Sequence, residues 1–73
     1  MTLAKLRAAH NLTQIELARK AGVTRPLISM IERGRRGVSP KLALRLVEAL
    51  GIAEPDRAQV VGQLVTAGAD HVR

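Results

Sequence analysis

A chain of 73 residues with no cysteine and no aromatic residue has room for one domain, which apolar packing must hold together because disulfides and thiolate metal sites are excluded. The net charge of +6 is unevenly placed, because residues 1–45 carry ten basic and two acidic residues, a net +8, and residues 46–73 are at −2. The missing aromatic side chains disfavour single-stranded nucleic acids, which are usually bound by base stacking, and leave duplex DNA as the expected polyanion.

The first predicted helix covers residues 2–10. Leu3 and Leu6 lie at helical spacing, and Thr2 is placed to accept a hydrogen bond from a free amide of the first turn. Asn11 follows, and asparagine tolerates the left-handed conformation that ends a helix. We therefore expect a short helix that stops before the next polar cap.

The second predicted helix begins with a capping box. Thr13 and Glu16 stand three residues apart, so each side chain can accept a hydrogen bond from the other residue's backbone amide. The helix is expected to run to about Ala21. Gly22 then supplies the conformational freedom for a sharp turn, and Thr24 is the expected N-cap of a third helix.

The third predicted helix lies between this turn and Gly34, which is expected to end it. Pro26 falls in its first turn, where the missing amide has no partner inside the helix. A short loop with the sequence R-R-G-V follows at residues 35–38. Most of the basic charge of the chain thus lies in and just after residues 13–33.

The fourth and fifth predicted helices complete the domain. Ser39 precedes a proline, the usual arrangement of an N-cap and a first helical residue, so a helix is expected over residues 40–50. A fifth helix is expected over residues 55–66, and residues 68–73 are expected to form a short C-terminal tail. The sequence therefore predicts an all-α fold with one compact domain over residues 1–67.

The apolar side of the fifth predicted helix has two explanations. A monomer of this size has little core against which to cover that side, so we expect it to form a homodimer interface. Packing within the chain is the alternative. The residues concerned are Val60, Val61, Leu64 and Val65.

These elements match a known pattern. The run L-T-Q-I-E-L-A-R-K-A-G-V-T at residues 12–24, followed by I-S-M-I-E-R-G at residues 28–34, resembles the lambda-repressor-like, Cro/C1-type helix-turn-helix family of bacterial and phage regulators. The resemblance covers residues 3–52. It implies a lambda-repressor-like domain of five helices, in which the second and third form the helix-turn-helix and the third enters the major groove of DNA.

The resemblance also implies roles for individual residues. The positions that would contact bases are Arg25, Pro26, Ser29 and Met30. The positions that would contact phosphates are Gln14, Thr24, Arg35, Arg36 and Lys41. Arg7 and Glu32 match a structural ion pair between the first and third helices.

Several of these roles have competing explanations. Arg25 suits a bidentate contact with guanine, and its alternative is a phosphate clamp. Ser29 could bond a base edge or stay solvated, and Met30 could touch a thymine methyl group or pack at the periphery. Pro26 stands where many relatives carry a polar side chain, which leaves more of the recognition to Arg25 and to DNA shape. Gln14 could also be an ordinary exposed residue of a first turn.

The expected function is a sequence-specific regulator of transcription, a repressor that binds a pseudo-palindromic operator in double-stranded DNA as a homodimer. The alternative is an antitoxin or adaptor that binds a partner protein such as a toxin, with DNA binding secondary. Ile15, an apolar residue at a position expected to face outwards, keeps that alternative open.

An enzyme is disfavoured on chemical grounds. His10 and His71 are the only histidines, and no serine has an identifiable base partner. No apolar run has the length of a membrane span, and the N-terminal residues do not resemble a secretory signal. We therefore expect no cofactor, no metal and no membrane partner, and a cytoplasmic protein associated with the nucleoid.

Overall fold

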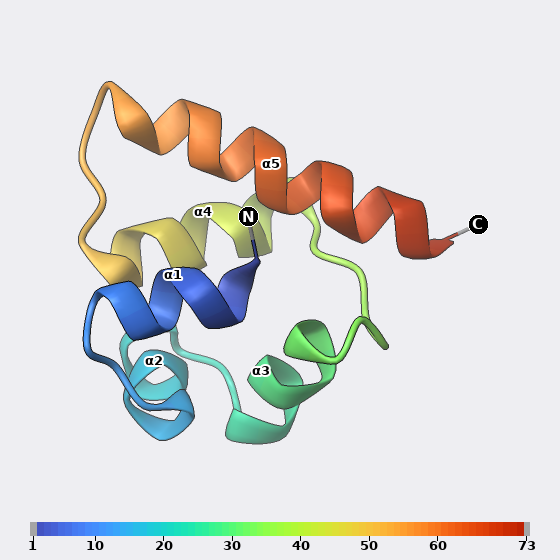
Figure 1. The fold of residues 1–73 in the computed structure, drawn as a ribbon, viewed down its shortest axis with the longest axis horizontal. Coiled ribbons are helices and arrows are strands. Elements are labelled where there is room, and N and C mark those ends of the chain that lie inside the picture. The colour runs from blue at the N-terminus through green and yellow to red at the C-terminus, as the bar shows by residue number, and fades with distance from the viewer. Residues whose placement is uncertain (1, 73) are drawn as a thin grey trace.

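The computed structural model describes residues 2–72, with side chains for residues 2–65. Its helices are α1 (Leu3–Ala9), α2 (Gln14–Ala21), α3 (Arg25–Glu32), α4 (Pro40–Leu50) and α5 (Asp56–Val72), and the described chain contains no strand. In Figure 1, α2 and α3 lie on one side of the molecule, α5 lies on the other, and α1 and α4 lie between them. The predicted all-α, five-helix fold is confirmed.

The first four helices begin where the sequence predicts, because a hydroxyl side chain caps each of them. The side chains of Thr2, Thr13, Thr24 and Ser39 each accept a hydrogen bond from the backbone amide three residues further on. The capping box is also present, since Thr13 N donates to Glu16 Oε1 at 2.8 Å and Glu16 N donates to Thr13 Oγ1 at 3.1 Å. Such caps satisfy amides that have no partner inside the helix.

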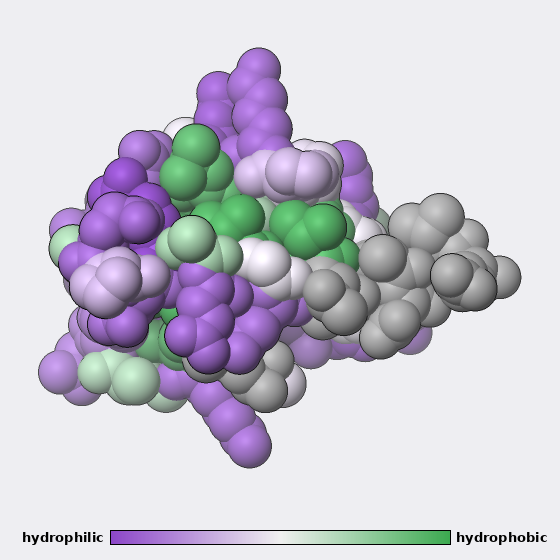
Figure 2. Space-filling model, turned by 90° about the horizontal axis from the view of Figure 1, so that it is seen from above, coloured by the Kyte–Doolittle hydropathy of each residue, from purple (hydrophilic) through white to green (hydrophobic). Residues whose placement is uncertain are grey.

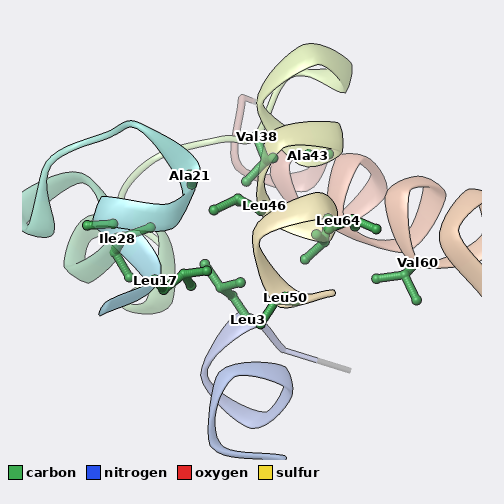
Figure 3. Close-up of a cluster of buried hydrophobic side chains, with 12 residues drawn as sticks. Leu3, Leu17, Ala21, Ile28, Val38, Ala43, Leu46, Leu50, Val60 and Leu64 are labelled. Carbon is green, nitrogen blue, oxygen red and sulfur yellow. The ribbon is translucent and has the colours of Figure 1, made fainter. Parts of the chain in front are cut away.

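The helices share one apolar core. Leu17 of α2, Ile28 of α3, and Leu46 and Val47 of α4 are completely buried. Leu3 of α1 closes the cluster from the other side, and Figure 3 shows these elements converging on it. Because the two helices of the predicted helix-turn-helix are anchored in the same core as α4, their relative orientation is fixed by packing.

The fifth helix differs from its prediction in extent. It begins at Asp56 and continues to Val72, so it runs past residue 66 and takes in most of the segment expected as a tail over residues 68–73. The boundary expected between residues 67 and 68 falls inside the helix. Intrinsic preference does not explain the extension, since Gly68 offsets the helix-favouring Ala67 and Ala69.

Two of the four residues expected at a dimer interface are buried in the monomer. Val60 is 7% exposed and Leu64 is 4% exposed, and both belong to the monomer core. Figure 3 shows Leu64 of α5 pointing toward α4. For these two residues the alternative, packing within the chain, is correct, because the side of α5 that carries them lies on α4. Val61 and Val65 are only partly buried at the edge of the core.

No helix in the described part of the chain combines the length and the apolarity that crossing a bilayer requires.

Candidate nucleic-acid interface

The turn between α2 and α3 is tight and is held by backbone hydrogen bonds. Gly22 adopts φ +72°, in the left-handed region where a side chain is unfavourable. Its amide donates to the Arg19 carbonyl at 3.3 Å, and the Val23 amide donates to the Ala18 carbonyl at 2.9 Å. Thr24 then begins α3 by accepting the Leu27 amide at 3.3 Å. The turn thus sets α3 at a defined angle to α2.

One side of α3 is open to solvent along its length. Ile28 is completely buried, and it fixes the opposite side of the helix to the core. The four residues expected to contact bases lie on the outward side, where Ser29 is half-buried and the others are exposed: Arg25, Pro26, Ser29 and Met30. At 100° per residue they occupy one continuous arc. We call this surface the reading face.

Arg33 extends the reading face and was missed by the sequence-based assignment. It is the exposed C-cap of α3 and lies eight residues after Arg25 and four after Ser29. Residues four apart lie on the same side of a helix, so these three form one row. That spacing is visible in the sequence and could have placed Arg33 on this surface.

The loop after α3 holds its two arginines at the surface. Arg35 and Arg36 are exposed, whereas Val38 is buried and ties the loop to the core. The Arg35 amide also donates to the Met30 carbonyl at 2.8 Å, which keeps the loop against the end of α3. Lys41 is exposed in the first turn of α4. The structure therefore exposes three of the expected phosphate contacts, Arg35 and Arg36 just after α3 and Lys41 at the start of α4.

The other two expected phosphate contacts have partners within the protein. Thr24 Oγ1 is engaged as an acceptor in its cap, which leaves its hydroxyl hydrogen able to donate. Gln14 is half-buried, and its Nε2 donates to Glu32 Oε1 at 2.9 Å. An amide nitrogen carries two hydrogens, so one donor of Gln14 is fixed by Glu32 and the second is unassigned.

Glu32 is the centre of a polar cluster that joins three helices. Arg7 of α1 donates to its carboxylate from Nε at 2.7 Å and from Nη2 at 3.2 Å, the bidentate arrangement of a strong ion pair. Arg7 Nη1 also donates to the Leu12 carbonyl at 2.9 Å. The expected ion pair is therefore present, and it holds the C-terminal end of α3 to α1 and, through Gln14, to α2.

The electrostatics of this cluster follow from its contacts. Burial raises the pKa of Glu32, but hydrogen bonds from Arg7 and Gln14, together with the charge of Arg7, outweigh that effect and leave the pKa lowered. The pKa of Arg7 is raised, chiefly by its hydrogen bond to Glu32. Glu32 consequently stays ionised and neutralised by Arg7, so its charge does not oppose an anion at the reading face.

Comparison with known proteins agrees with this geometry. The profile of the helix-turn-helix family matches residues 3–56. An uncharacterized HTH-type transcriptional regulator of Methanocaldococcus jannaschii is 46% identical over 50 residues, which cover 68% of this chain and 76% of that protein. No solved structure matches the chain significantly.

Proposed function

This chain belongs to the Cro/C1-type helix-turn-helix family of DNA-binding transcription regulators, and on that premise we propose that it is a repressor that binds a specific operator in double-stranded DNA as a homodimer. The observation that carries the proposal is the solvent-exposed reading face of α3, flanked by the cations of the following loop. A helix fits the major groove, where each base pair presents a distinct pattern of donors and acceptors.

Base recognition in this proposal depends mainly on Arg25. Its guanidinium matches O6 and N7 of guanine, a contact that discriminates between bases by about 1–3 kcal/mol. Ser29 offers one hydrogen bond to a base edge, and Pro26 and Met30 offer apolar contacts. Because few side chains on this face read polar groups, the local shape of the DNA supplies the rest of the specificity.

Phosphate contacts fix the register of the protein on the duplex without reading sequence. Arg33, Arg35 and Arg36 are exposed at and just after the end of α3, and Lys41 is exposed in the first turn of α4. The second donor of Gln14 and the hydroxyl of Thr24 complete this set. Glu32 supports the Gln14 contact, because its hydrogen bond to Nε2 orients the amide.

An apolar surface on α4 and α5 supports the homodimer. Leu44 is 41% exposed, and Val61 and Val65 are partly buried. The two helices run in opposite directions (Figure 1), and Arg57 Nη1 of α5 lies 3.7 Å from Glu48 Oε2 of α4. One helical turn beyond this pair, Leu44 of α4 and Val61 of α5 therefore lie next to each other. Seen from the α5 side, apolar side chains gather in one area among hydrophilic ones (Figure 2).

We call Leu44, Val61 and Val65 the α4–α5 patch. A twofold dimer would place this patch against its own copy, which buries apolar surface from both chains. It would also present two reading faces to successive turns of the major groove, about 34 Å apart. The patch replaces the interface expected from sequence, since Val60 and Leu64 are used by the core.

Selection of binding sites from random duplex DNA tests the proposal directly. The expected result is a pseudo-palindromic consensus whose half-sites lie one helical turn apart, with a guanine at the position that Arg25 contacts. Recovery of unrelated sequences with no consensus would contradict sequence-specific binding. An asymmetric consensus would contradict the symmetric dimer while leaving DNA recognition intact.

A second candidate function is that of an antitoxin or adaptor held by a partner protein. Ile15 of α2 favours it, because this apolar side chain is 50% exposed beside the DNA-facing side of the domain. A partner bound at Ile15 would compete with DNA. In either case we propose that the protein acts in the cytoplasm, on DNA of the nucleoid.

A further inference from the structure

A basic groove runs between α2 and α4, outside the reading face. One hollow of about 290 Å³ is lined by Lys20, Ala21, Arg45, Glu48 and Ala49. A second hollow of about 270 Å³ is lined by Ser39, Lys41, Leu42 and Arg45. Arg45 lines both hollows, so they adjoin each other along α4, and we call the two together the α2–α4 groove.

The charge of the α2–α4 groove is positive. Lys20, Lys41 and Arg45 are exposed, and none of them lies within ion-pair distance of a carboxylate in the part of the chain whose side chains are described. Glu48 is the acidic residue of the lining, and it is engaged by Arg57 from α5. Glu16 lies one turn before Lys20 on α2 and outside the lining. Three cations against one paired carboxylate favour an anionic occupant.

The geometry points to the phosphate backbone of duplex DNA beyond the segment that α3 reads, and we propose that the α2–α4 groove binds this flanking DNA. Lys41 belongs both to the groove and to the expected phosphate contacts beside α3. Arg45 lies four residues further along α4, about 6 Å along the helix axis. The two cations therefore lie in a row along one side of α4.

The position of the groove indicates which DNA it would contact. Arg45 and Ala49 lie on the side of α4 that faces α2, whereas Leu44 lies on the side that faces α5. In the proposed dimer the α4–α5 patches meet at the twofold axis, so the two grooves open outwards, toward the ends of the operator. This inference therefore rests on the proposed function, and it adds that the DNA flanking the operator curves toward the sides of the domain.

The test compares two duplexes that share one selected consensus. The short duplex ends at the last base pair of the consensus, and the long duplex extends about one helical turn, or 10 bp, further at each end. Fluorescence anisotropy at several salt concentrations measures the affinity of the wild type and of the double variant Lys20→Ala/Arg45→Ala for both. Arg19→Ala is the matched control, because Arg19 is exposed in the same turn of α2 as Lys20 but does not line the groove.

The double variant is expected to bind the short duplex like the wild type and the long duplex more weakly. For each protomer, the slope of log Kd against log salt on the long duplex should fall by about 1.8, which corresponds to two phosphates. Exchanging the flanking sequence should have no effect, because the groove reads no bases. Circular dichroism verifies the fold, which both substitutions should preserve because the side chains are exposed and alanine favours helix.

Three results would overturn the inference without affecting the proposed function. Equal losses on both duplexes, or an equal loss for Arg19→Ala, would mean that the cations act through general charge instead of through the groove. Unchanged binding of the long duplex would assign the groove to another partner, such as an acidic protein surface. Failure of the wild type to bind the short duplex would instead contradict the proposed function itself.

Discussion

Arg7→Ala tests the contact that ties the end of α3 to α1. The substitution removes two hydrogen bonds to Glu32, at 2.7 and 3.2 Å, and one to the Leu12 carbonyl, at 2.9 Å. The Glu32 side chain is 8% exposed, so water replaces the lost donors only in part, and Gln14 remains as its hydrogen-bond donor in the cluster. Removing one partner of a buried pair costs about 3–5 kcal/mol, and because Arg7 is partly exposed we expect about 3 kcal/mol.

That loss is large for this protein, because a domain of 73 residues has a total stability of about 4–11 kcal/mol. Urea denaturation followed by far-ultraviolet circular dichroism measures it as a lower midpoint with an unchanged slope. Glu48→Gln is the control, since the pair of Glu48 with Arg57 joins exposed side chains and should contribute less than about 1 kcal/mol. An equally small loss for Arg7→Ala would refute the buried-pair argument.

The same variant has a characteristic dependence on pH. The pKa of Glu32 is lowered in the folded protein, so its contribution to stability is complete above the ordinary carboxylate pKa of about 4.3 and is lost as the pH falls through the lower folded value. In Arg7→Ala, Glu32 stays buried but loses its main hydrogen-bond donor, and this favours the protonated carboxyl group. The stability difference between the two proteins should therefore narrow in acid. A difference that stays constant with pH would contradict this account of Glu32.

The remaining predictions concern binding, the turn and assembly. Arg25→Ala should reduce discrimination between operator variants, whereas Arg35→Ala should weaken all duplexes alike and lower the salt slope by about one; equal losses on cognate and random DNA would reduce Arg25 to a phosphate clamp. Gly22→Ala should destabilise the protein by about 1–2 kcal/mol because φ is +72°, although an added Cβ would meet no atom. Gly62→Ala in α5 should stabilise the protein by about 0.5–1 kcal/mol. Urea midpoints that shift in the same direction for the two variants would contradict this. Leu44→Lys should shift sedimentation toward monomer with the fold intact, and an unaltered dimer would exclude the α4–α5 patch.

The beginnings of the first four helices could be predicted because they depend on nearby residues. Thr13 and Glu16 are three positions apart, and their mutual hydrogen bonds form wherever the helix starts. Gly22 and the N-cap Thr24 likewise fix the turn through contacts within a few residues. The linked spacing of these elements also identified the family, which the comparisons confirm.

Other features depend on residues that are distant in sequence. An apolar side on α5 fits a core or a dimer equally well, and only the placement of α5 on α4 assigns Val60 and Leu64 to the core. The hydrogen bond from Gln14 to Glu32 joins residues eighteen positions apart, and no local sequence pattern predicts it. Arg33 is a different case, because its spacing of eight residues from Arg25 is visible in the sequence.

The attachment of α3 has a consequence for how such a protein diversifies. Ile28 and Glu32 secure the helix to the rest of the molecule, and neither belongs to the reading face. Mutations at the outward positions therefore leave folding largely untouched, and a lineage can acquire a new target site without passing through an unfolded ancestor. A library randomised at Arg25, Ser29 and Met30 should accordingly yield mostly well-folded proteins with altered sequence preferences.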